Sequence, residues 1–95
     1  MNYEDMSDHK INCLVDTQLF ISGDGQPKMF NLDNPADWGR LIQDNKISCN
    51  WWVDEEGGNN DCWEASTSTR WENSRHKTSP GRAVSICYLK SKEAE

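Results

Sequence analysis

Hydrophobic positions recur along this chain with two spacings, and each spacing predicts a different element. Ile11, Leu14 and Val15 lie three and four residues apart, which is typical of one helix face. Ser7 precedes them and can accept hydrogen bonds from the free N–H groups of the first helical turn. A first helix is therefore expected to begin after Ser7.

The following segment predicts a β-hairpin and then a second helix. Leu19-Phe20-Ile21 is a short apolar run, Ser22-Gly23-Asp24-Gly25 is rich in turn residues, and Lys28-Met29-Phe30 can form the returning strand. Asp33 or Asn34 can then cap a helix that has Pro35 at its first position. The core-facing stripe of this helix is Trp38, Leu41, Ile42 and Asn45.

Residues 47 to 67 predict a second hairpin, because their side chains alternate in character. One face carries Ile47, Cys49, Trp51, Val53, Trp63, Ala65 and Thr67, and the other carries Ser48, Asn50, Trp52, Asp54, Cys62, Glu64 and Ser66. A polar, glycine-rich loop joins the two strands. The alternation predicts Trp51 and Trp63 together in the core and Trp52 outside it.

After a polar loop from Arg70 to Gly81, a last helix is expected to begin at Ser79 as N-cap and Pro80 as first residue. Its apolar positions are Ala83, Val84, Ile86, Cys87, Tyr88 and Leu89. The predicted fold is a single α+β domain over residues 1–95. It has a small antiparallel sheet of two hairpins packed by three helices, in the order α-ββ-α-ββ-α.

Net charge, the length of apolar runs and the cysteine content reduce the number of functions that the sequence allows. The chain has 95 residues and a net charge of −6, which disfavours a general binder of nucleic acid or of anionic membranes. The same charge permits a partner with a basic surface. The longest apolar run is too short for a transmembrane span or a signal peptide, so a cytosolic location is expected. In that reducing compartment Cys13, Cys49, Cys62 and Cys87 are expected as free core thiols, with zinc or disulfides as the alternatives.

Several short blocks of residues are similar to a known family. They include Met6-Ser7-Asp8, Asn34-Pro35-Ala36-Asp37, Asn45-Lys46-Ile47-Ser48, Arg82-Ala83 and Ser91-Lys92-Glu93. In these blocks the chain resembles the NinX-like proteins, a family of small proteins from enterobacterial phages and prophages with no assigned function. The resemblance implies a phage accessory protein made inside a bacterial host, and it assigns no functional residue. Ser85 departs from the family pattern, which is usually apolar at that position.

Catalytic chemistry is not predicted. His9 and His76 are the only histidines; His9 is expected on the polar side of the first helix, and His76 lies in a basic loop with no acid at a spacing that would orient it. We therefore expect no enzyme activity, no cofactor and no bound metal.

Two segments are candidate binding sites. Trp52, on the polar side of its strand, is followed by Asp54, Glu55 and Glu56, and this group could contact a partner protein. The alternative is that the fold or a second subunit covers Trp52. The other segment is basic: Trp71, Arg75, His76, Lys77 and Arg82 precede or begin the last helix and could bind an anion there, or else form an ordinary solvated loop.

The function hypothesis that follows is a small phage-encoded, non-enzymatic binding protein that modulates a host process, most plausibly an anti-phage defence system. A host protein with a basic or nucleic-acid-binding surface is the expected partner. One alternative is sequestration of an anionic small molecule, such as a signalling nucleotide, by the basic segment. Another is an accessory role in phage DNA metabolism.

Overall fold

The computed structural model describes residues 3–21, 23, 29–53, 57, 61–67, 73–76 and 78–93, with the backbone alone at Trp52 and Asn73. A short 3-10 helix η1 (Tyr3–Asp5) precedes α1 (Asp8–Ile21) and α2 (Pro35–Asn45). The strands β1 (Ile47–Trp52), β2 (Cys62–Thr67) and β3 (Asn73–His76) follow, and α3 (Pro80–Glu93) is the last helix. The α+β class is confirmed, with three helices and a three-stranded antiparallel sheet among the described residues.

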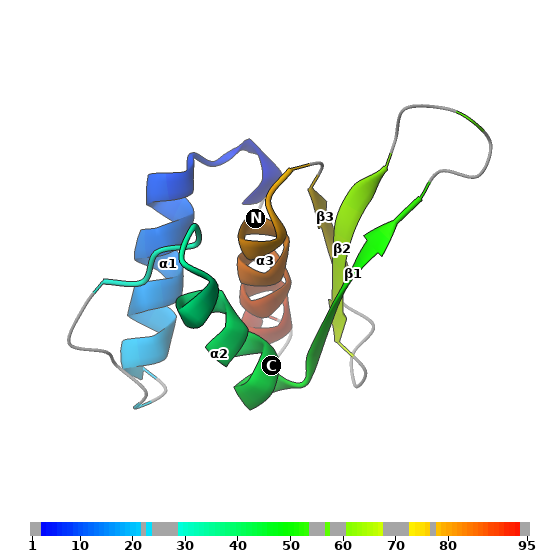
Figure 1. The fold of residues 1–95 in the computed structure, drawn as a ribbon. Coiled ribbons are helices and arrows are strands. Elements are labelled where there is room, and N and C mark those ends of the chain that lie inside the picture. Colours follow the sequence, from blue (N-terminus) through cyan, green and yellow to red (C-terminus); the bar gives the residue numbers. More distant parts are fainter. Residues whose placement is uncertain are drawn as a thin grey trace.

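Helix α3 is the centre of the fold. It lies between α1 and α2 on one side and the sheet on the other (Figure 1). Every residue from Gly81 to Leu89 is buried, as expected of a helix that has neighbours all around it. Ser85 is fully buried and its hydroxyl donates to the Gly81 carbonyl at 2.7 Å, so a polar residue is accommodated inside the core. Among the described helices none is long and apolar enough to span a membrane.

The first predicted hairpin is wrong. Leu19, Phe20 and Ile21 are the last residues of α1, because Leu19 continues the buried stripe of Ile11 and Val15 at a spacing of four. Phe20 and Ile21 are exposed on the other sides of the helix. The Ser7 cap is confirmed, since its hydroxyl accepts the Lys10 N–H at 3.2 Å.

The predicted returning strand was Lys28-Met29-Phe30. Lys28 lies outside the described residues, and Met29 and Phe30 are not part of a strand. Phe30 and Leu32 are buried. Side chains of α1 take the place of a neighbouring strand: Asn12 Oδ1 accepts the Leu32 N–H at 2.9 Å, and Asp16 Oδ1 accepts the Phe30 N–H. The backbone donors of this segment are thus satisfied without a ladder.

The other helix boundaries agree with the sequence. Asn34 Oδ1 caps α2 by accepting the Ala36 N–H, with Pro35 in the first turn, and Lys46 ends the helix in the left-handed conformation. Ser79 caps α3, and its hydroxyl accepts the Arg82 N–H at 3.1 Å.

The second hairpin is confirmed, and a third strand extends it. β1 and β2 pair antiparallel with Trp51 opposite Trp63, and β3 pairs antiparallel with β2 with His76 opposite Trp63. The strand order β1-β2-β3 leaves β1 and β3 as the two edges. β3 lies in the segment predicted as a polar loop, where Asn73-Ser74-Arg75-His76 has no alternation of apolar residues to reveal a strand.

Candidate functional site

Burial decreases steadily along the inner face of β1. Ile47 is 3% exposed, Cys49 is half-buried, Trp51 is 47% exposed and Val53, just past the strand, is 53% exposed. All four share one side of the strand, so the predicted parity is right. The prediction that Trp51 belongs to the core is wrong, because the hairpin projects beyond the helices that cover its base (Figure 1).

An aromatic row crosses the sheet at this level. Trp51 and Trp63 lie edge to face with ring centroids 5.3 Å apart, and His76 is the next residue across, on β3. Trp63 is partly buried and packs against the core. Edge-to-face contact stabilises the pair by about 0.5–1.5 kcal/mol beyond the area it buries. Trp63 therefore supports one side of Trp51, while about half of the Trp51 surface stays exposed to solvent.

His76 connects this row to a cavity at the start of α3. Its Nδ1 accepts the backbone N–H groups of Ser79 at 2.9 Å and Thr78 at 3.3 Å. A ring nitrogen that accepts two such bonds carries no proton, so the proton of the neutral ring is on Nε2. The imidazole thereby orders the turn between β3 and α3, a role that its sequence context did not reveal.

The cavity has a volume of about 630 Å³ and is open to solvent. Its charged lining residues are Glu4, Asp8, Asp33 and Arg82. Its other lining residues are Met6, Ser7, Leu32, Pro35, Trp38, His76, Thr78, Ser79, Pro80 and Gly81. Three carboxylates against one guanidinium make this a poor site for a phosphate, despite the positive end of the α3 dipole.

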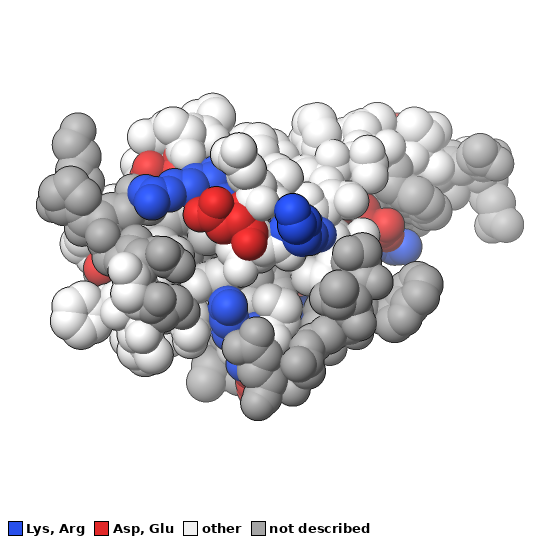
Figure 2. Space-filling model, turned by 90° about the horizontal axis from the view of Figure 1, so that it is seen from below, with Lys and Arg blue, Asp and Glu red and all other residues white. Residues whose placement is uncertain are grey.

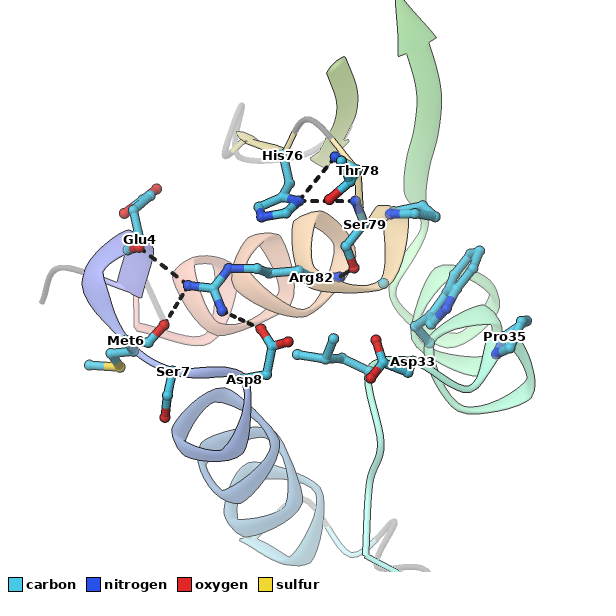
Figure 3. A pocket seen from close by; sticks show the side chains of 14 residues that line it. Glu4, Met6, Ser7, Asp8, Asp33, Pro35, His76, Thr78, Ser79 and Arg82 are labelled. Atoms are coloured by element: carbon cyan, nitrogen blue, oxygen red, sulfur yellow. Dashed lines mark hydrogen bonds and ion pairs between the residues drawn. The ribbon is translucent and has the colours of Figure 1, made fainter. Parts of the chain in front are cut away.

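The Arg82 guanidinium forms its ion pair and hydrogen bonds within the protein. Its side chain is only 9% exposed and pairs with Asp8 Oδ1 at 2.6 Å. Its other terminal nitrogen donates to the carbonyls of Tyr3, Glu4 and Met6. Figure 3 shows the side chain extending from α3 to Glu4, Met6 and Asp8. Arg82 thus fixes η1 and the start of α1 to the central helix, and it is not available to a ligand without loss of these contacts.

The predicted anion site does not assemble as expected. Arg75 and His76 are neighbours on β3, so their side chains lie on opposite faces of the sheet. Arg75 Nε pairs with Glu64 Oε2 at 2.7 Å across the outer face. The expected convergence of Arg75 with His76 is therefore wrong. Trp71 and Lys77 lie outside the described residues, so the structure brings together only His76 and Arg82 of the five.

The predicted partner-binding group is described only in part. Trp52 is the last residue of β1, opposite Cys62, and its backbone alone is described. Asp54, Glu55 and Glu56 lie outside the described residues. The prediction that Trp52 lies outside the core therefore stays a prediction, whereas Trp51, the residue before it in β1, is 47% exposed.

Charges of the two signs are mixed on the surface. Seen from below, Lys and Arg side chains lie interspersed with Asp and Glu among the coloured residues (Figure 2). Ion pairs between described residues include Lys90 with Glu4 and Arg40 with Asp44. Among the described residues on that face, the Lys and Arg side chains form no continuous basic patch.

Nucleophiles and metal ligands do not form a recognisable centre in the described part of the chain. Cys13 Sγ lies 3.7 Å from His9 Nε2, one turn apart on an exposed side of α1, and neither residue lines the cavity at α3. None of the four cysteines, all of which are described, forms a disulfide; Cys62 and Cys87 are buried, and Cys13 and Cys49 are half-buried. The described residues contain no group of three metal-binding side chains.

Among the described residues, the geometry therefore offers an exposed apolar surface at Trp51 and Val53 of the hairpin, a second at Phe20 and Ile21 at the end of α1, and an acidic cavity at the start of α3. No protein-family model, no curated protein and no solved structure matches the chain, so the resemblance to NinX-like proteins stays a prediction from its residues.

Proposed function

We propose that this chain is a small non-enzymatic protein that binds another protein through the projecting end of the β1–β2 hairpin. The observation that supports the proposal is the exposure of Trp51 and Val53 on one face, with Trp51 held against Trp63. Aromatic side chains that are fixed in place yet half in solvent are the usual anchors of protein interfaces. Ordering such a residue on binding costs little entropy because the contact with Trp63 has already ordered it.

The setting that we propose is the cytosol of a bacterial host, where the chain modulates a host process such as an anti-phage defence system. The phage setting is supported by the resemblance of several short residue blocks to the NinX-like proteins. The net charge of −6 favours a target protein with a basic surface. A role in phage DNA metabolism through a protein partner is compatible with the same surface. Sequestration of a nucleotide has less support, because Arg82 is held by the fold and Arg75 lies on the opposite face from His76.

The test is affinity capture from bacterial host lysate with three forms of the protein. Trp51→Ala removes the anchor, and Phe20→Ala removes an equally apolar side chain that is exposed at the end of α1. We expect a host protein to be retained in stoichiometric amount by the wild type and by Phe20→Ala, and lost with Trp51→Ala. Equal capture by the two variants, both folded by circular dichroism, would contradict the proposal.

A further inference from the structure

The two edges of the sheet differ in a way that bears on how a partner is bound. β3 is four residues long, contains Arg75 and His76, and is followed at once by Lys77. Short length and charged side chains are common means by which proteins prevent an edge strand from pairing with another chain. By these criteria β3 is a protected edge.

β1, in contrast, has no such protection. It is six residues long, Ile47 to Trp52, and contains neither a charged residue nor proline. None of the turn, loop or capping backbone hydrogen bonds among the described residues involves β1. Because alternate residues of an edge strand direct their N–H and C=O groups away from the sheet, β1 presents a row of backbone groups that another strand can pair with.

The position of β1 in the fold leaves room for another strand. α2 lies near the Ile47 end, whereas the Trp52 end projects away from the helices (Figure 1). A strand added beside β1 would place side chains next to Trp51 on the inner face and so extend the row that Trp51, Trp63 and His76 form. Backbone pairing would supply affinity, and the aromatic row would select the side chain that meets it.

Charge indicates what kind of segment fits this edge. In the sequence, three carboxylates, Asp54 to Glu56, directly follow Val53, and the exposed Asp61 precedes β2. Lys46 lies at the other end of β1. An added strand would therefore be favoured if its basic residues lie at the Trp52 end. A second copy of the chain is disfavoured, because each copy carries a net charge of −6.

We propose that the outer edge of β1 accepts an extended, basic segment of a partner protein as a fourth, antiparallel strand. The inference rests on the proposed function, since it specifies how that partner binds. In the antiparallel orientation, which pairs slightly more strongly than the parallel one, the basic residues of the segment precede its strand-forming residues. The basic residues then lie at the Trp52 end of β1, toward the exposed Asp61, and an apolar side chain of the segment contacts Trp51.

The probe is a synthetic peptide of three lysines followed by alternating valine and threonine, titrated into isotope-labelled protein and followed by NMR. We expect amide shifts to concentrate in residues 47–53 rather than in β3. A peptide with the lysines at its other end should bind about tenfold more weakly, which is the size expected of a few exposed charge contacts. Shifts that avoid residues 47–53, or equal affinity of the two peptides, would overturn the proposal.

Backbone methylation separates strand pairing from simple side-chain contact. Methylating the alternate amides of the peptide that face β1 should abolish binding, and methylating the other set should leave it unchanged. In the protein, Asn50→Lys on β1 should weaken binding about tenfold, while Ser66→Lys, on the same face of the central strand β2, should not. Equal effects of the two methylations or of the two substitutions would overturn the edge proposal.

Failure of this inference and failure of the proposed function give different results. If the capture of a host protein still depends on Trp51 but no peptide shifts β1, strand addition is rejected and binding through the aromatic face stands. If the β1 amides shift with protein concentration in the absence of peptide, the edge pairs with a second copy, and the basic partner is rejected as its occupant.

Discussion

At the scale of single residues, the four cysteines are the most direct probes of burial. Cys13 and Cys49 are half-buried, whereas Cys62 and Cys87 are buried. Burial also raises the pKa of the Cys49 thiol, which lowers its thiolate fraction at neutral pH. We expect a thiol reagent such as Ellman's reagent to modify Cys13 first, Cys49 next, and Cys62 and Cys87 only as the protein unfolds. Modification of Cys87 in the folded protein as fast as Cys13 would contradict the packing of α3.

Tyr3 predicts a specific dependence of stability on pH. Burial, and after it a hydrogen bond from its hydroxyl to Glu93 Oε2, raise the pKa of Tyr3 from 10.0 to about 12. Between these values the folded protein keeps a proton that the unfolded chain has released. The stabilisation is therefore complete below pH 10 and is lost as the pH rises through 12.

Urea unfolding of the wild type and of Tyr3→Phe from pH 9 to 12 measures this effect. The difference in unfolding free energy between the two proteins should shift in favour of Tyr3→Phe as the pH rises. A difference that stays constant over this range would show that the Tyr3 hydroxyl titrates alike in both states.

At the scale of elements, the contact between α2 and α3 depends on a glycine. A Cβ at Gly81 would overlap the Leu32 carbonyl oxygen and lie 2.5 Å from Trp38 Cδ1. Gly81→Ala should therefore destabilise the protein by about 1–3 kcal/mol, although alanine is the better helix former. Gly39 in α2 has no neighbour within 4 Å of such a Cβ, so Gly39→Ala should be neutral or stabilise by up to about 1 kcal/mol. Equal effects of the two substitutions in thermal unfolding would refute this account.

Elements with a strong local signal could be predicted from the sequence. The Ser7 and Ser79 caps were predicted, and Asn34 is one of the two caps predicted for α2, because a side chain that accepts a backbone N–H acts within a few residues. Alternation alone also predicted that Trp51 and Trp63 lie on the same face of the hairpin.

The elements that were missed depend on contacts between distant residues. The end of α1 is an exception, because Leu19 follows Val15 by four residues and so continues the helix stripe by a local spacing, which competes with the strand-like apolar run Leu19-Phe20-Ile21. β3 is a strand because β2 supplies its hydrogen bonds, which its own polar sequence does not indicate. Similarly, the cavity at the start of α3 brings Glu4, Asp33 and His76 together from three distant segments, and no local pattern could place them there.

At the scale of the whole molecule, the central helix and the projecting hairpin have separate roles. α3 is surrounded by α1, α2 and the sheet, so it holds the fold together, and the buried Arg82 ties η1 and the start of α1 to it. The hairpin extends past these helices with Trp51 and Val53 exposed. The packing around α3 therefore stabilises the fold, and the hairpin is the part that we propose binds a partner.

The claim that most needs testing is that Trp51 is available to a partner rather than required by the fold. The direct measurement is the free energy of unfolding of Trp51→Ala, determined by urea denaturation beside Leu41→Ala, which removes a buried core side chain. We predict a loss of about 1–2 kcal/mol for Trp51→Ala, mainly its contact with Trp63, and of about 2–5 kcal/mol for Leu41→Ala. A loss of about 3–5 kcal/mol for Trp51→Ala, the range of a buried tryptophan, would place Trp51 in the core and contradict the account.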